Sequence, residues 1–130
     1  MPSTVFLSWQ TDTPSRTGRN FLRQVLNDAC RSIAADTSLS EAQRNTKVDS
    51  DTQGVSGQPP IVDTILKKIE AASVFVADMT FVAQRPKKGG RLPNPNVSIE
   101  YGYALKALTH ERVICVMNSA YGKPTARRVI

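Results

Sequence analysis

The sequence predicts an α/β fold in which an open parallel sheet carries helices on both faces. Short apolar runs typical of strands alternate with longer segments whose apolar residues recur at helical spacing. The clearest run, residues 73–78, is apolar on both faces, as a central strand of a parallel sheet should be. Such alternation produces parallel strands joined by right-handed crossovers. The chain has 130 residues, which is enough for one domain with a core and too few for two.

The expected elements follow one another in a regular order. In chain order we expect a strand at 4–8, a helix at 18–34, a strand at 47–49, a helix opening at Pro59, a strand at 73–78, a helix capped by Asn94 and a strand at 112–117. The apolar stripe of the first helix consists of Phe21, Leu22, Val25, Leu26, Ala29 and Ile33. Residues 35–46 are polar and weakly periodic, which indicates a connection. Residues 81–93 are long for a strand-to-helix loop and indicate either a lid or a disordered segment.

The last expected helix combines a clear start signal with a single acid. Asn94 is suited to capping the helix, and Pro95 to its first position, where no N–H is needed. The buried stripe is predicted to contain Val97, Tyr101, Ala104, Leu105 and Leu108. Glu100 borders this stripe, and a carboxylate there is costly unless it has a partner or a task. Glu100 is therefore the leading catalytic candidate.

Polar residues follow several of the expected strands and should meet at one edge of the sheet. Ser8 and Trp9 follow the first strand, Asp51 follows the second, and Asp78 ends the third. Asn96 and Glu100 open the last helix at the same edge. Ligands of open parallel sheets bind beyond the carboxyl ends of the strands, near a switch in strand order. These segments therefore predict a common binding cleft.

Four segments together carry a resemblance to a known family. They are residues 5–10 (VFLSWQ), 49–55 (DSDTQGV), 74–80 (VFVADMT) and 94–104 (NPNVSIEYGYA). In this order they resemble bacterial Toll/interleukin-1 receptor (TIR)-like domains, and they are also similar to the nucleoside deoxyribosyltransferases. The most specific part is the Asn-x-x-x-Glu helix combined with the Asp-x-Asp-Thr-x-Gly loop.

The resemblance implies a flavodoxin-like three-layer sandwich and cleavage of the nicotinamide–ribose bond of NAD, with hydrolysis or cyclisation of the ADP-ribose. It also implies self-association through TIR-type contacts and a role as an effector in anti-phage defence or signalling. The family fold continues with another helix and strand beyond the point at which this sequence stops. We therefore expect residues 1–130 to be a single TIR-like domain at the N-terminal part of a longer protein, lacking the last helix and strand.

The expected chemistry centres on the Glu100 carboxylate. Cleavage of an N-glycosidic bond builds positive charge on the ribose, which a nearby carboxylate stabilises. Trp9 would stack on a base of the substrate. The residues expected to bind hydroxyls or orient the acid are Ser8, Asp51, Asp78 and Asn96. NAD enters as the substrate, and we expect no cofactor and no metal, because Asp49 and Asp51 have no His or Cys beside them.

Other functions and roles remain open at this stage. The same fold can serve as a non-enzymatic self-association module, with Glu100 binding backbone N–H groups of a loop. It can also transfer glycosyl groups between nucleosides, with Glu100 as the nucleophile. Trp9 can be a packing residue and Asp78 the cap of a turn, and His110 is expected to face solvent.

Composition narrows the function classes. The formal charge of +6 is spread along the chain, except for a basic run at residues 85–91 and a cluster of Lys123, Arg127 and Arg128. We interpret the basic run as a solvated loop, with attraction of a phosphorylated ligand as the alternative. Nucleic-acid binding is not expected, because no aromatic platform or known motif accompanies these charges. The two cysteines, Cys30 and Cys115, are expected to be reduced thiols in the core. The sequence shows no signal peptide and no apolar run of membrane-spanning length, so we expect a cytoplasmic protein.

Overall fold

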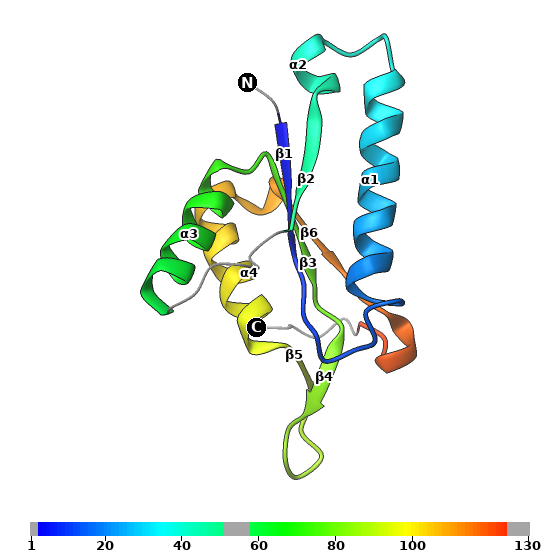
Figure 1. Cartoon of the computed structure of the whole chain (residues 1–130). Helices are drawn as coiled ribbons and strands as arrows, with labels where there is room; N and C mark the ends of the chain where they lie inside the picture. Colours follow the sequence, from blue (N-terminus) through cyan, green and yellow to red (C-terminus); the bar gives the residue numbers. More distant parts are fainter. Residues whose placement is uncertain (1–2, 51–57, 125–130) are drawn as a thin grey trace.

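The computed structural model describes residues 3–50 and 58–124. Its centre is a four-stranded parallel sheet in the order β2-β1-β3-β6 (Figure 1). The strands are β1 (Ser3–Ser8), β2 (Thr46–Asp49), β3 (Val74–Asp78) and β6 (Val113–Val116). One face carries α1 (Arg19–Ala35), and the other carries α3 (Gln58–Ala71) and α4 (Pro95–Leu108). The predicted three-layer α/β sandwich with a central parallel sheet is confirmed.

The strand order places a switch point between β1 and β3. From β1 the chain moves outward to β2, and it then returns to place β3 on the other side of β1. Ser8 pairs with Ala77 in the parallel register of these two strands, so both lie at the carboxyl end of the sheet. Crevices at such switch points are the usual binding sites of open parallel sheets.

The core lies between the sheet and the layer formed by α3 and α4. Phe6 of β1 and Phe75 of β3 stack with ring centroids 5.8 Å apart and an interplanar angle of 7°. The α4 stripe covers these rings, and its residues Val97, Ala104 and Leu108 are buried as predicted. This packing fixes the rotation of α4 about its own axis.

The opposite face differs from the prediction. The α1 stripe was expected to face the core, but α1 contains no buried residue, and Phe21 and Val25 remain 56% and 45% exposed. Ile114 of β6 is also half exposed. Periodicity identifies which side chains share a stripe, but it does not tell how much of the sheet that stripe covers. Within the described residues α1 covers this face by itself, so a large part of its apolar stripe stays accessible.

Two segments expected to be irregular contain regular structure. Residues 35–46 include a short helix, α2 (Glu41–Arg44), with a capping box between Ser40 and Gln43. Four residues are too few for a periodic pattern, which explains why the sequence did not reveal this helix. Two 3₁₀ turns, η1 (His110–Arg112) and η2 (Ser119–Tyr121), flank β6. None of the helices within residues 3–50 and 58–124 is both long and apolar enough to cross a membrane.

The segment at 81–93 is an antiparallel hairpin of β4 (Phe81–Gln84) and β5 (Arg91–Pro93), so the expectation of a disordered segment is wrong. Two backbone hydrogen bonds close its turn, from Arg85 N to Gly90 O at 3.0 Å and from Gly89 N to Pro86 O at 3.0 Å. Lys87 and Lys88, between them, adopt left-handed φ values of 55° and 59°. A left-handed residue with a side chain costs roughly 1–2 kcal/mol.

The cysteines also differ from expectation. Both are free, but Cys30 is only half-buried and Cys115 is exposed, so neither belongs to the core. Partial burial raises the pKa of both thiols, which disfavours the reactive thiolate form.

Replacing one phenylalanine on each face of the sheet should show that the two helical layers contribute unequally to the free energy of unfolding. Phe75→Ala should lower the free energy of unfolding by about 3–5 kcal/mol, because Phe75 is fully buried. The matched variant Phe21→Ala should change it by less than about 1 kcal/mol, because Phe21 is largely exposed. Urea denaturation followed by circular dichroism measures both. Equal losses would show that α1 packs as tightly as α4.

Candidate functional site

The site is built around a contact between β1 and α4. Ser8, the last residue of β1, is buried, and its hydroxyl donates a hydrogen bond of 2.8 Å to Oε1 of Glu100. The two residues are separated by 92 positions in the sequence. Because Val97 and Ala104 anchor α4 on the sheet, Glu100 is directed toward the carboxyl end of β1.

The Glu100 carboxyl lies in a partly dry environment. Burial raises the pKa of Glu100, and the hydrogen bond from Ser8 opposes this increase in part by stabilising the ionised form. No Lys, Arg or His within residues 3–50 and 58–124 forms an ion pair with it. A desolvated carboxylate without a cationic partner is a common feature of catalytic sites.

Glu100 lines a cavity of about 410 Å³ at the carboxyl edge of the sheet, a volume within the usual range of small-ligand sites. The loop that follows β1 forms one wall, and α3 and the first half of α4 form the other. The cavity is lined by Trp9, Gln10, Thr11, Val62, Ile65, Leu66, Asn94, Asn96, Ile99 and Glu100.

Trp9 is held in place on two sides. Its Nε1–H donates a hydrogen bond of 2.7 Å to the backbone oxygen of Ser50. The guanidinium of Arg19 lies over the indole, 4.3 Å from the ring centroid, in a cation–π contact. Trp9 therefore presents a fixed aromatic surface at the cavity and brings a positive charge near it.

The start of α4 forms the rim of the cavity. The Asn94 side chain caps the helix by accepting hydrogen bonds from the backbone N–H groups of Asn96 and Val97, at 2.8 and 3.2 Å. Its amide nitrogen donates to Asp12 at 2.7 Å, which ties the helix start to the loop after β1. The predicted cap is confirmed, and the amide of Asn96 lines the cavity.

Asp78 does not line the Glu100 cavity. Its carboxylate is buried and accepts hydrogen bonds from the backbone and hydroxyl of Thr80 and from the amide of Gln10. It borders a second cavity, of about 390 Å³, on the α1 side of the sheet. In this position Asp78 stabilises the turn after β3, as the alternative interpretation of the sequence proposed.

Two of the other residues considered in the sequence, Asp49 and His110, lie outside this cavity. Asp51 falls outside the described residues. Asp49 lies within 3.4 Å of the Lys68 ammonium. His110 is exposed in η1, as expected. Within the described residues no group of three His, Cys, Asp or Glu side chains is arranged to hold a metal ion.

Several cavity residues were not among the predicted site residues. Gln10 could have been included, because it directly follows Trp9 after β1. Val62 and Ile99 could not, because both lie off the buried stripes of their helices and are 50% and 68% exposed. Their contribution to a cavity wall depends on how α3 and α4 pack together.

Comparison with known proteins identifies a fold but no family. No protein-family model and no curated protein matches the sequence. The structure is similar to a 2-desoxiribosyltransferase from Leishmania mexicana, with a TM-score of 0.52 and 15% sequence identity. The likeness covers 89% of this chain and 63% of that enzyme. It shows a deoxyribosyltransferase-like α/β fold, and these comparisons give no support to the TIR resemblance.

Replacing the Glu100 carboxylate by a neutral amide should stabilise the protein, and the size of this gain should depend on pH. Because the pKa of Glu100 is raised on folding, its ionisation destabilises the protein as the pH rises through the folded-state pKa. Glu100→Gln should therefore unfold at a higher temperature than wild type at pH 8, and this difference should vanish below the ordinary pKa of 4.5. Thermal unfolding across this pH range measures the effect. A Glu100→Gln protein that is less stable at pH 8 would indicate a strong cationic partner for the carboxylate.

Proposed function

We propose that this protein cleaves or transfers the N-glycosidic bond of a nucleoside-type substrate, with the Glu100 carboxylate acting at the anomeric carbon of the sugar. The observation that carries the proposal is the pairing of Glu100 with Ser8 in the wall of a cavity of suitable size. The location at the switch point between β1 and β3 supports it, as does the fold likeness to a deoxyribosyltransferase.

The geometry suggests a division of labour between the two carboxylate oxygens. Ser8 holds Oε1, so Oε2 is the atom that approaches the sugar. As the bond between the anomeric carbon and the base nitrogen breaks, its electron pair leaves with the base. The positive charge on the sugar is stabilised by the carboxylate, which then bonds to the anomeric carbon. A second base or water attacks the anomeric carbon of this ester, passes its proton to the departed base and releases the carboxylate unchanged.

The cavity walls supply distinct surfaces for the two halves of such a substrate. Trp9 and the apolar wall formed by Val62 and Leu66 suit the flat, weakly polar base. The exposed side-chain amide of Asn96 provides a donor and an acceptor for sugar hydroxyls. This arrangement places the polar half of the substrate beside Glu100.

NAD cleavage is the second candidate, and the position of Arg19 favours it. The Arg19 guanidinium lies against Trp9, which belongs to the cavity wall, and this cation would be available to the pyrophosphate of a bound dinucleotide. In this case the same carboxylate would release nicotinamide, by hydrolysis or with cyclisation, and self-association of the chain would accompany activity. A role in cytoplasmic anti-phage defence belongs to this second candidate.

The decisive assay supplies both substrate classes to concentrated protein. A deoxyribonucleoside with a second free base, and NAD in a parallel reaction, are followed by liquid chromatography for base exchange and nicotinamide release. Glu100→Gln should lower the active reaction by at least about 10²–10³-fold, because it removes the charge that stabilises the sugar cation. Glu111→Gln, at an exposed acid of η1, is the matched control and should retain activity.

The two candidates and their alternative give different results. Base exchange identifies a glycosyl transferase, and nicotinamide release identifies an NAD-cleaving enzyme. If wild type self-associates but consumes neither substrate, the protein is an interaction module and Glu100 has a structural role.

A further inference from the structure

We propose that the β4–β5 hairpin is a docking element for double-stranded nucleic acid, binding the phosphate backbone through its basic tip. This surface is separate from the Glu100 cavity and does not depend on the proposed reaction. It was expected from the sequence to be a solvated loop, and its ordered structure changes that interpretation.

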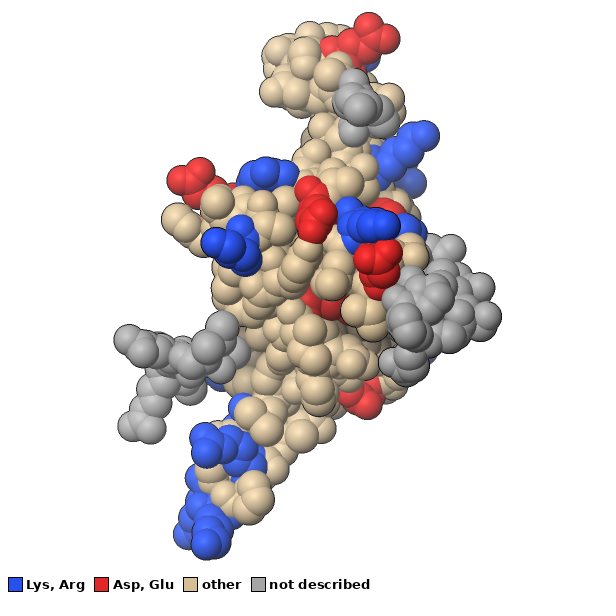
Figure 2. Space-filling model, turned by 90° about the vertical axis from the view of Figure 1, so that its left-hand side faces the viewer, with Lys and Arg blue, Asp and Glu red and all other residues tan. Residues whose placement is uncertain are grey.

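The hairpin carries several positive charges close together and no negative charge to balance them. Arg85, Lys87, Lys88 and Arg91 are all exposed, and no acidic residue occurs between Asp78 and Glu100. None of the four forms an ion pair with any residue in the described part of the chain. Figure 2 shows the basic side chains gathered at the projecting lower end of the molecule. A cluster of this kind attracts polyanions over several ångströms.

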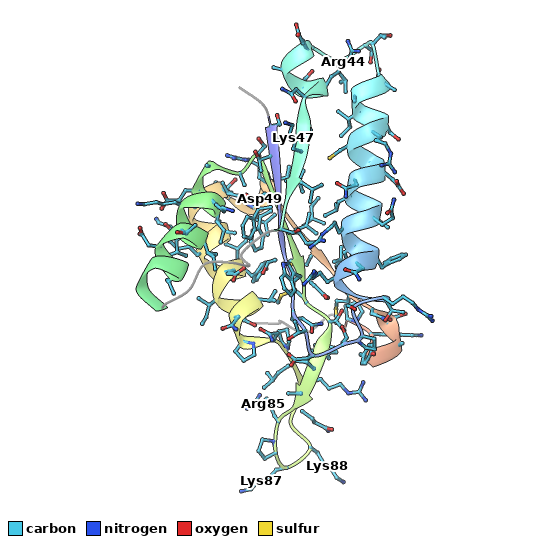
Figure 3. The ribbon with its side chains drawn as sticks, in the orientation of Figure 1. Arg44, Lys47, Asp49, Arg85, Lys87 and Lys88 are labelled. Carbon is cyan, nitrogen blue, oxygen red and sulfur yellow. The ribbon has the colours of Figure 1, made fainter. Side chains whose placement is uncertain are left out.

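The hairpin is built to hold its charges outward. It extends away from the main sheet, and the labelled side chains Lys87 and Lys88 project from its tip (Figure 3). Its base is fixed where Arg91 donates a hydrogen bond of 2.7 Å to the backbone oxygen of Tyr121. Gly122, at φ 133°, allows this approach, since a Cβ there would lie 2.7 Å from Arg91 and 2.8 Å from Phe81. The tip is therefore presented by a supported ribbon.

The tip residues are unfavourable for the turn that they form. A two-residue turn with left-handed φ at both central positions favours Asn and Gly, yet here Lys87 and Lys88 occupy them. Two glycines, Gly89 and Gly90, follow immediately and do not occupy the left-handed positions. Strained residues that persist in a structure point to function. We infer that the turn keeps these lysines for their charge.

The shape and composition of the tip favour nucleic acid over a membrane. The tip, residues 85–90, carries no large apolar side chain to insert among lipids. A two-stranded ribbon fits the major groove of B-form DNA, where its flanking cations meet phosphates on both sides. The tip has no Asn, Gln, Asp or Glu side chain, and its Arg and Lys side chains bind phosphate oxygens of any sequence, so binding would depend mainly on phosphate charge.

The test compares two double variants that remove the same charge. Fluorescence anisotropy with a labelled DNA duplex of about 20 bp measures affinity at several salt concentrations. Lys87→Asn with Lys88→Gly leaves a turn of the favoured Asn-Gly type, so thermal unfolding should be unchanged or shifted upward. This variant should bind at least about 10-fold more weakly, and its salt slope should fall by about 1 for each lysine.

The control variant, Lys47→Gln with Lys106→Gln, removes two exposed lysines elsewhere and should bind like wild type. Equal losses in both variants would reduce the effect to net charge and overturn the proposal. Wild type that fails to bind the duplex at about 50 mM salt would overturn it too. So would lysine-dependent binding to phosphatidylserine vesicles with no binding to the duplex.

Discussion

The packing of α4 against β1 and β3 is the constraint on which the rest of the structure depends. Phe6 and Phe75 stack across the two central strands, and Val97 and Ala104 of α4 lie in the same buried cluster. This contact sets both the position of α4 along the sheet and its rotation. Glu100, which lies between these two α4 anchors in the sequence, is consequently directed at the end of β1. The catalytic candidate is thus positioned by apolar packing.

The cavity around Glu100 and the tip of the hairpin that precedes α4 have different electrostatic environments. Around Glu100 the protein provides a half-dry cavity, one hydroxyl donor and no ion pair among the described residues, which favours a reactive carboxylate. At the tip of the hairpin, Lys87 and Lys88 are exposed to solvent and form no ion pair with any described residue. A carboxylate in the first environment suits chemistry on one small ligand. Cations in the second suit a large, charged partner.

Prediction from sequence succeeded where a local signal had a single structural meaning. Asn94 and Pro95 mark the start of α4 because a cap and an N–H-free residue satisfy the same helix end. It failed where the outcome depended on neighbours. Phe21 lies on a regular apolar stripe, yet it remains exposed because no further helix of the described chain covers that face. The hairpin at 81–93 was missed because its strands have few residues and pair only with each other.

The sequence alone determined the α/β class, the order of strands along the chain and the cap of α4. It also singled out Glu100 as a carboxylate whose position beside an apolar stripe needs a partner or a function. These follow from periodicity, capping chemistry and the cost of placing a charge beside an apolar stripe. Only the tertiary structure decided which polar residues share the cavity with Glu100. It joined Ser8 to Glu100, assigned Asp78 to a buried turn and added Val62 and Ile99 to the wall. Contacts between residues far apart in the chain depend on how the layers pack, and no local pattern records that.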